Sequence, residues 1–552
     1  MDQVRIFALG GLDENGKNMT VLEINDVIFV VEAGMKFPES DQLGVEFIIP
    51  DFQYLIDNKD RIGGIFITHA HDDVAAALPY LLKQIDAPVY TGNLTANIIH
   101  ERLKKEGIKR SKIHRLKRVS RQKINGIEVR TFPMTHSFPD NFGIAFGSSQ
   151  GYIVYTGEYI VDYDMLKDEY LCDLNELSEI GKKGVLCLMS ESQAVERDGH
   201  SAPNHRITNL IEPVFERSNS RIIVSCYTDS LFRVMEIIDL AKKHQRKIYF
   251  HDKDLRDLLK HLEQVKYYQV PKEMELTDKT FHNDMEDVMV VISGSGKNLF
   301  RKLSNIANKE DAKISFRTSD NIIIASPVVS GTELDYNNME NNIYREGGKL
   351  ITLDSKKALS MHPSSEDLKM MMYLFRPKYY IPVKGEYRHL YMNANLAMKV
   401  GYGADRILVL DNGQAAVFEN KILTSVSERI ELEDTLIDGK ENWDVTGVVL
   451  KDREVLSTDG VMIVGVGVNF KNKEIINGPD VQTRGLIYLK DADYIIKEVG
   501  NMMEECIVAA VKEKRYDNLA VRAEARDKIT KYLMKETGKR PMVLPVILEI
   551  NL

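Results

Sequence analysis

The residues best suited to chemistry stand together in the segment THAHDDV, at residues 68–74. It offers the imidazoles of His69 and His71 and the carboxylate of Asp73, which are side chains that bind divalent metals. The segment follows the apolar run GGIFI, which is typical of a buried strand. Its side chains should therefore lie in a loop at the strand's end, where they can converge on an ion. Two ordinary surface histidines would give the same spacing.

Apolar and alternating runs predict the elements that position this loop. The opening runs RIFALGG, MTVLEIN and VIFVVEAG predict a β-meander with a turn at Asn25-Asp26. Further short strands are expected near residues 88–90, 127–134, 152–155 and 185–189. Each of them leads into a polar or glycine-containing loop, so several loops can contribute to one site.

The pattern changes along the chain in a way that predicts several domains. Between residues 204 and 350, helical and strand patterns alternate, which favours an α/β unit with a parallel sheet. Residues 351–440 again show a pattern of short strands, as residues 1–203 do. We therefore interpret 204–350 as an insertion into a first domain. A polar linker at 441–452 and a compact α+β domain at 453–552 complete the prediction.

The composition is that of a folded protein without membrane segments. Hydrophobic residues make up 43% and charged residues 28% of the 552, which excludes a disordered chain. No apolar run of about 18 residues and no signal-peptide pattern occur, so we expect a cytoplasmic protein with no membrane partner. The four cysteines are far apart and lack CxxC spacing, which favours buried thiols over disulfides or zinc knuckles. They are Cys172, Cys187, Cys226 and Cys506.

The formal charge of −9 excludes attraction of nucleic acid by the whole surface. Any nucleic-acid contact must therefore be local. Residues 102–123, RLKKEGIKRSKIHRLKRVSRQK, and residues 297–313 are basic stretches that offer such a contact. Runs of this kind also occur as solvated faces of folded proteins.

The THAHDDV segment resembles the HxHxDH signature of the metallo-β-lactamase superfamily, in which two histidines serve one zinc and the Asp and final His serve a second. His69, His71 and Asp73 match, whereas a valine replaces the final His. His136 in PMTHSFPDNFG is similar to the third histidine of the first zinc site. Glu158 in VYTGEY stands where the superfamily has a bridging Asp.

Longer stretches narrow the resemblance to ribonuclease J and extend it over nearly the entire chain. In RPKYYIPVKGEYRHL, Lys384 replaces the last metal-binding His of the family's PVHGEYR. GVLCLMSESQAVERDGHS is similar to the segment with the first acidic β-CASP residue, here Glu191. In ALSMHPSSEDLK, Ser360 and His362 match while Ala358 replaces a histidine. The lost ligands make the chain similar to the catalytically degenerate second paralogue of this family.

The resemblance implies an α/β fold with three parts. An αββα metallo-β-lactamase sandwich would consist of residues 1–203 and 351–440, with a β-CASP α/β domain inserted at 204–350. A small C-terminal α+β domain would follow at 453–552. RNA would run between the sandwich and the inserted domain.

At most one metal site is implied. His69, His71, His136 and Glu158 would be its ligands, a set that suits Zn²⁺ or Mn²⁺. At the second position a valine and an ammonium replace two imidazoles and leave Asp73, so the second ion should be absent. The first site is left open as occupied, weak or empty. Glutamate in place of aspartate at position 158 moves the carboxylate by about one C–C bond, which argues against a bridging role between two ions.

Candidate catalytic and phosphate-binding residues also follow from the resemblance. Asp73 and His362 are the candidate catalytic residues, and His362 with Ser360 resembles a phosphate-binding motif. Lys384 would supply a fixed positive charge to an RNA phosphate or would pair with a nearby acid such as Asp73.

The inserted domain should add further RNA contacts. Arg233 matches the family, whereas Asp229 should repel a 5′-phosphate. The stretch ISGSGKNLFRKLSNIA resembles the family's TGSQGEP. Its residues Ser293, Gly294 and Ser295 would bind a phosphate through backbone N–H groups or form an ordinary turn.

Three functions are compatible with these features. The first is an RNA-binding partner of an active J-type subunit in mRNA turnover and rRNA maturation, weak or inactive as a nuclease, with the C-terminal domain contributing to a homo- or hetero-oligomer. The second is an active metal-dependent 5′-to-3′ exoribonuclease or endoribonuclease. The third is a non-catalytic structural scaffold. The first accounts for every lost ligand, and the retained Asp73, His136 and His362 favour the second.

Overall fold

The computed structural model describes residues 2–39, 42–109, 111–164, 167–329, 331–353, 360–439, 447–486 and 493–551. The chain forms two compact units, one of residues 1–36 and 49–434 and the other of residues 37–48 and 435–552. Ala358 and the first six residues of the predicted linker lie outside the described residues. Among the helices within these ranges, none combines the length and apolar character needed to cross a membrane.

The first unit begins with the predicted meander, which grows into an eight-stranded sheet. Strands β2 and β3 pair antiparallel across the turn at Asn25-Asp26, as predicted. The strand order is β21-β20-β1-β2-β3-β5-β6-β7, and β3, β5, β6 and β7 run parallel. The bounds are β1 (Val4–Gly10), β2 (Met19–Ile24), β3 (Val27–Val31), β5 (Ile62–Ile67), β6 (Val89–Thr91), β7 (Ile113–Arg115), β20 (Gln414–Glu419) and β21 (Ile422–Arg429).

A second, six-stranded sheet contains strands from both sides of the insertion, in the order β19-β12-β11-β10-β9-β8. Strands β12 and β19 pair in parallel, with Glu191 opposite Val383, so two distant segments end side by side. The bounds are β8 (Ser120–Ile124), β9 (Ile127–Pro133), β10 (Phe142–Ser148), β11 (Gly151–Tyr155), β12 (Val185–Glu191) and β19 (Tyr379–Val383).

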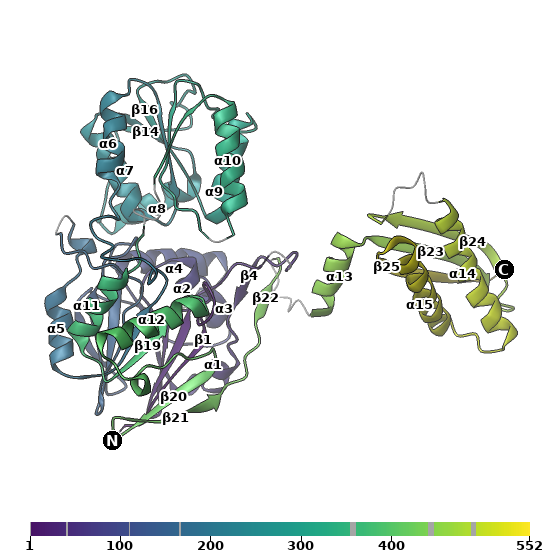
Figure 1. Ribbon diagram of the computed structural model, residues 1–552, viewed down its shortest axis with the longest axis horizontal. Helices are drawn as coiled ribbons and strands as arrows, with labels where there is room; N and C mark the ends of the chain where they lie inside the picture. The colour runs from purple at the N-terminus through teal and green to yellow at the C-terminus, as the bar shows by residue number, and fades with distance from the viewer. Residues whose placement is uncertain are drawn as a thin grey trace. The chain divides into compact units, whose positions relative to one another are not determined.

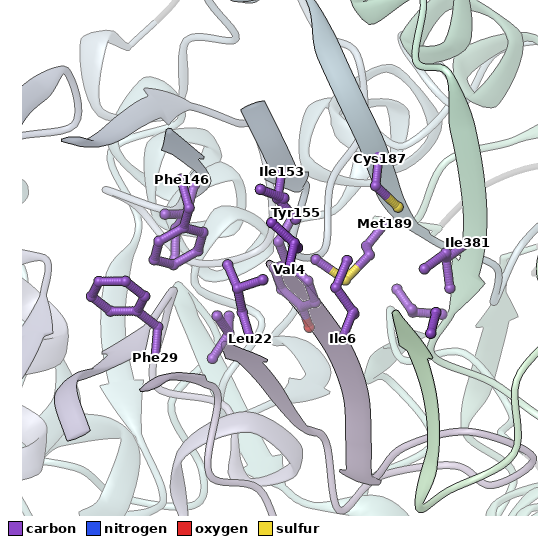
Figure 2. Close-up of a cluster of buried hydrophobic side chains, with 14 of the residues drawn as sticks. Val4, Ile6, Leu22, Phe29, Phe146, Ile153, Tyr155, Cys187, Met189 and Ile381 are labelled. Atoms are coloured by element: carbon purple, nitrogen blue, oxygen red, sulfur yellow. The ribbon is translucent and has the colours of Figure 1, made fainter. Parts of the chain in front are cut away.

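The core of this unit lies between the two sheets. Phe29 and Leu22 from the first sheet meet Phe146 and Ile153 from the second, and all four side chains are buried (Figure 2). The rings of Phe29 and Phe146 have centroids 4.9 Å apart. Burying each such side chain contributes roughly 1.5–3 kcal/mol, so this layer is a main source of stability for the unit.

Helices cover the sandwich on the outside. Apolar residues of three helices pack on the outer face of the second sheet: α5 (Leu174–Lys182), α11 (Ser365–Phe375) and α12 (Tyr387–Val400). Four others lie in the connections of the first sheet: α1 (Gln53–Asp57), α2 (Asp72–Ala75), α3 (Leu78–Leu82) and α4 (Asn93–Lys105). The predicted αββα sandwich is confirmed. The loop after β5 leads into the two short helices α2 and α3, and Pro79 lies in the first turn of α3, where a proline is tolerated.

The inserted domain is an α/β unit, as predicted. Its sheet has the order β15-β14-β16-β13-β17-β18, and all its paired strands are parallel. Helices α6 to α8 pack on one face and α9 and α10 on the other (Figure 1). The strands are β13 (Ile222–Tyr227), β14 (Lys247–Phe250), β15 (Glu275–Leu276), β16 (Val288–Gly294), β17 (Asn321–Ile324) and β18 (Lys349–Thr352). The helices are α6 (Thr208–Arg217), α7 (Leu231–Lys243), α8 (Lys253–Gln264), α9 (Gly296–Ala307) and α10 (Glu333–Arg345).

The second unit is the expected α+β domain, with one strand that the sequence pattern did not indicate. Its three-stranded sheet has the order β24-β23-β25, and the long helices α14 and α15 pack against one face. Strand β24 was missed because its residues do not form an apolar run. Helix α13 covers the second half of the predicted linker. The bounds are α13 (Gly447–Thr458), β23 (Val461–Asn469), β24 (Ile475–Arg484), α14 (Asp493–Lys512), α15 (Asn518–Thr537) and β25 (Met542–Ile550), with a short β4 (Phe47–Ile49) beside β22 (Thr435–Ile437).

The four cysteines are all buried as free thiols, as the sequence predicted. Burial raises the pKa of Cys172 to about 12, because it disfavours the thiolate. These thiols are therefore core residues and not metal ligands.

We predict that a buried ion pair holds the inserted domain together. Arg221 donates to both oxygens of Asp320, at 3.0 and 2.5 Å, and both side chains are fully buried. The change Asp320→Ala should cost about 3–5 kcal/mol, because it leaves a buried guanidinium without its partner. The measurement is the free energy of urea unfolding.

The pair of Arg301 and Asp335, whose side chains are 56% and 21% exposed, provides the control for this prediction. Asp335→Ala should cost at most about 1 kcal/mol, since surface pairs contribute little. Equal losses for the two variants would contradict a special role for the buried pair.

Candidate metal centre

The four candidate metal ligands come from three strand ends of the first unit. His69 and His71 follow β5, His136 follows β9, and Glu158 follows β11. Strand β5 belongs to the first sheet, whereas β9 and β11 belong to the second. The packing of the two sheets thus brings together side chains that lie almost 90 residues apart, and their ligand atoms all lie within 4.8 Å of one another.

A single oxygen of Glu158 is the centre of this cluster. Its Oε2 lies 3.1 Å from His136 Nε2, 3.4 Å from His69 Nε2 and 3.8 Å from His71 Nδ1. His69, His136 and Glu158 are buried, and His71 is half-buried. Three imidazole nitrogens and one carboxylate oxygen therefore face a common point.

The other nitrogen of each imidazole has a partner that orients the ring. His136 Nδ1 donates to the Met361 carbonyl at 2.9 Å. His71 Nε2 lies 3.0 Å from Ser137 Oγ. His69 Nδ1 lies 2.9 Å from Thr68 Oγ1, whose hydroxyl in turn donates to Glu32. These contacts leave the lone pair of the remaining nitrogen directed at the cluster, as metal-binding histidines require.

The residues fit a metal ion. His69 Nε2 and His136 Nε2 are buried and make no hydrogen bond. Unpaired polar atoms in a protein interior are costly, and a bound cation would satisfy both nitrogens at once. Three imidazoles and one carboxylate form a tetrahedral set that suits Zn²⁺ and also Mn²⁺.

The pKa values of the four side chains bear on whether they can bind a cation. Burial and the neighbouring His71 lower the pKa of His69 well below its ordinary value, and burial lowers that of His136 to about 4. Burial opposes protonation of His71, but the carboxylates of Asp229 and Glu158 raise its pKa to about 9. Burial alone would raise the pKa of Glu158, yet Lys384 and the histidines hold it well below the usual range. Glu158 is thus an anion and His69 and His136 are neutral, as ligation requires, whereas His71 would release a proton when a metal binds.

Lys384 occupies the other side of Glu158. Its Nζ donates to Glu158 Oε1 at 2.9 Å, and both side chains are 2% exposed. Of the two roles considered for Lys384, pairing with an acid fits these contacts, although the acid is Glu158 and not Asp73. Because Nζ is buried, a phosphate at the surface would not reach it.

The second metal position has no complete ligand set. Val74 is fully buried in α2 and offers no donor atom. The carboxylate of Asp73 accepts a hydrogen bond from Asn18 Nδ2 at 3.0 Å. Burial and the charge of Glu158 raise the pKa of Asp73 to about 8.

His362 stands at the rim of the cluster. Its ring centroid lies 5.5 Å from that of His136, and its Nδ1 lies 2.8 Å from Glu191 Oε2. Burial opposes protonation, but the charge of Glu191 raises the pKa of His362. The side chain is 30% exposed, so this imidazole is open to a ligand.

The segment with His362 is clamped by residues that motif matching did not single out. The carboxylate of Asp367 is fully buried and accepts from the backbone N–H groups of Ser201 and Ser364. Ser201 Oγ donates to the His362 carbonyl at 2.6 Å. The signal in the sequence was the run SSED, because Ser364 and Asp367 form a capping box at the start of α11.

Two of the four residues predicted to bind RNA in the inserted domain are turned inward. Arg233 and Ser293 are buried. The Ser293 N–H donates to Asp252 at 2.6 Å, and the Gly294 carbonyl accepts from the Thr228 N–H. Ser295, at the start of α9, is exposed. Of this group, only Ser295 is presented to solvent as a phosphate site would require.

Ser360 lies beside His362 and is half-buried. Its hydroxyl accepts from the His362 N–H and donates to the His362 carbonyl, each at 3.3 Å. Ser360 therefore shapes the backbone at His362.

The inserted domain reaches the metal cluster through Asp229, whose carbonyl lies 3.4 Å from His71 Nε2. Nearby, the Phe232 N–H donates to the Ser137 carbonyl at 2.9 Å. The sequence marked Asp229 only as a possible repulsive charge, because a contact between residues 158 positions apart has no local signal.

We predict that His136 and Asp73 differ in their effect on metal binding. His136→Ala removes a ligand of the four-residue cluster, so the dissociation constant for Zn²⁺ should rise by more than about 100-fold. Asp73→Ala removes a side chain outside that cluster and should change it by less than about tenfold. Competition with a fluorescent zinc chelator measures both constants, and equal effects would contradict the four-ligand assignment.

Comparisons with known proteins agree with this geometry. Residues 12–169 match the metallo-beta-lactamase superfamily, residues 219–343 the ribonuclease J beta-CASP domain and residues 448–550 the ribonuclease J C-terminal domain. Ribonuclease J 2 of Staphylococcus epidermidis is 33% identical over 549 residues, which cover 99% of this chain and 98% of that protein. Ribonuclease J 2 of Staphylococcus aureus is 32% identical over the same share.

A solved structure supports the fold alone. It is a protein of unknown function from Enterococcus faecalis, with a TM-score of 0.52 and 13% sequence identity, and the match covers 76% of this chain and all of the other. The family domains and the full-length relatives, together with the clustered histidines, lead to one conclusion. This chain belongs to the ribonuclease J family.

Proposed function

We propose that this chain is an RNA-binding subunit in cytoplasmic RNA processing and decay. It has weak or absent 5′-to-3′ exo- and endoribonuclease activity of its own and acts beside an active J-type subunit. The observation that carries this proposal is the buried pair of Lys384 and Glu158, at 2.9 Å. An ammonium stands where the family resemblance calls for an imidazole that binds the second metal.

The chemistry explains the loss of activity. In a two-metal hydrolase the ions lower the pKa of a shared water and neutralise charge on the scissile phosphate. Here Val74 and Lys384 provide no donor atom for a second ion. Lys384 also engages Glu158 Oε1, so only Oε2 faces the histidines. These residues support at most one ion, Zn²⁺ or Mn²⁺, and a centre with weak or absent hydrolytic activity.

We predict that restoring two imidazoles restores the second ion. The double variant Val74→His and Lys384→His should bind two metal ions per chain after Mn²⁺ loading and desalting, where the wild type binds at most one. Its RNA cleavage should rise by at least about 100-fold, because a single well-placed electrostatic group contributes about that much. Elemental analysis and a labelled RNA substrate provide the two readouts.

The matched control for this variant is Lys399→His, an exposed change on α12. It should leave the metal content and the cleavage rate unchanged. Two ions per chain in the wild type, with rapid cleavage, would overturn the proposal.

A working nuclease is the second candidate, and one observation favours it. The pair of His362 and Glu191 is intact at 2.8 Å beside the four-ligand cluster. An imidazole held in this way can donate a proton to a leaving oxygen. Cleavage of RNA by the isolated chain that disappears in His362→Ala would establish this function, and failure to bind any RNA would favour a purely structural scaffold.

The second unit supports the proposed role in an oligomer. One face of its sheet is covered by α14 and α15, but the opposite face exposes apolar side chains. Ile463 lies opposite Leu544 in the pairing of β23 with β25, and Leu548 and Ile550 follow on the same face. Leu548 is 61% exposed. An apolar sheet face of this kind is suited to cover by another subunit.

We predict that a charge on this face weakens assembly. Leu548→Asp should lower the affinity for the active J-type subunit by at least about tenfold, because the carboxylate would be desolvated at the interface. Light scattering after size-exclusion chromatography of the mixture measures the complex. Leu519→Asp, at an exposed position of α15, is the control. An equal effect of both changes would argue against the sheet face.

A further inference from the structure

The strongest concentration of positive charge lies between the candidate metal ligands His71 and His136 in the sequence. Residues 102–123 contain eleven Lys and Arg residues and one acidic residue. The whole chain has 73 basic and 82 acidic residues, so the rest of it has 62 and 81, a net charge of −19. A segment of charge +10 in such a chain is a local anion-binding feature and not part of a generally basic surface.

The fold places this segment along one open edge of the sandwich. Strand β7 is the edge of the eight-stranded sheet and β8 is the edge of the six-stranded sheet. Only residues 116–119 separate the two strands, so the two sheet edges lie next to each other. We name the exposed cations here the basic edge. They are Lys104, Lys105, Lys109, Lys112, Arg115, Lys117, Arg121 and Lys123.

Several of these charges are not engaged within the protein. Among the residues that the structure describes, Lys109, Lys117 and Lys123 make no ion pair. Lys112 lies 3.1 Å from Asp86, but their side chains are 65% and 78% exposed. Such surface pairs contribute little and exchange readily with another anion.

A stack of rings ends at the same edge. Phe66, Tyr90 and His114 are register neighbours on β5, β6 and β7. The rings of Phe66 and Tyr90 have centroids 4.9 Å apart at an interplanar angle of 16°, and those of Tyr90 and His114 lie 4.8 Å apart at 17°. Phe66 is buried, Tyr90 half-buried and His114 exposed. The stack therefore runs from the core to the last strand of the sheet, where the His114 ring is open to solvent.

We propose that the basic edge is a binding site for single-stranded RNA, in which lysines contact successive phosphates and a base continues the stack on His114. Cationic side chains interleaved with an exposed ring are the combination that single-stranded nucleic acid needs. In a duplex the base faces are already stacked on one another, and an acidic peptide has no base to stack on the His114 ring. Both ligands therefore match the ring stack less well than single-stranded RNA does. The choice of RNA rests on the proposed function.

The lysines are tested by charge removal. The probe is a 3′-fluorescent 12-nucleotide RNA of mixed sequence, titrated with the full chain in EDTA so that no cleavage occurs. The variant with Lys109, Lys112, Lys117 and Lys123 all changed to Gln should bind at least about tenfold more weakly at 0.1 M salt. Its slope of log K against log [salt] should fall by about 3, because each lost phosphate contact removes about 0.7. The control changes Lys260, Lys272, Lys279 and Lys399, which are also exposed, to Gln.

The stack is tested with a 2-aminopurine base in the same RNA. His114→Ala should weaken binding about tenfold and abolish the quenching of 2-aminopurine fluorescence that stacking causes. His114→Phe keeps a ring without a titratable nitrogen and should restore both affinity and quenching. A loss of affinity that Phe does not restore would overturn the stacking contact.

Other outcomes would overturn the site itself. An unchanged salt slope in the lysine variant, with new self-association of the chain, would mean that the lysines only protect the sheet edges. Binding of poly-glutamate as tight as that of RNA, and equally sensitive to the lysine changes, would make this edge a site for acidic proteins. Absence of RNA binding by the wild type would overturn the proposed function, whereas tight binding that the variants leave intact would overturn this site alone.

Discussion

The arrangement of the candidate centre depends on the carboxylate of Glu158, which lies close to three histidines and to Lys384. One oxygen faces three imidazole nitrogens, and the other accepts from Lys384. A buried anion is tolerated only when it is paired, and Lys384 provides that partner whether or not a metal is bound. The family's two-ion arrangement is thus replaced by one candidate ion site and one fixed ammonium. In this arrangement the Lys384 ammonium pairs with the carboxylate of Glu158.

The sandwich makes this arrangement possible because the candidate ligands follow the ends of strands whose positions are fixed by the packing of the two sheets. The imidazoles come from both sheets, and each has a second hydrogen-bond partner that fixes its orientation. The inserted domain contributes as well, since the Asp229 carbonyl lies near His71. The geometry of the cluster therefore depends on how the inserted domain packs on the sandwich.

Charge is distributed unevenly over this chain. The metal cluster is rich in acids, including Glu32, Asp73, Glu158 and Glu191. The exposed positive charge of the basic edge lies at the end of α4, on the edge strands β7 and β8 and in the segments between these elements. Burial keeps the pKa of Glu32 raised to about 7, which lowers the anionic charge of the interior. The proposed RNA contacts therefore rest on this exposed positive charge and not on the acidic interior.

Residue identity determined which chemistry was possible, because the side chains of Val74 and Lys384 offer no lone pair to a metal. Apolar patterning was enough to predict the opening meander, the inserted parallel sheet and the final domain, whereas the αββα sandwich was implied by the family resemblance. The partner of Lys384, the burial of Arg233 and the ring stack at His114 were decided only by tertiary structure. The physical reason is that ion pairs, burial and stacking across strands depend on distances between segments far apart in the chain. Local pattern gives side-chain type and spacing, but it does not give those distances.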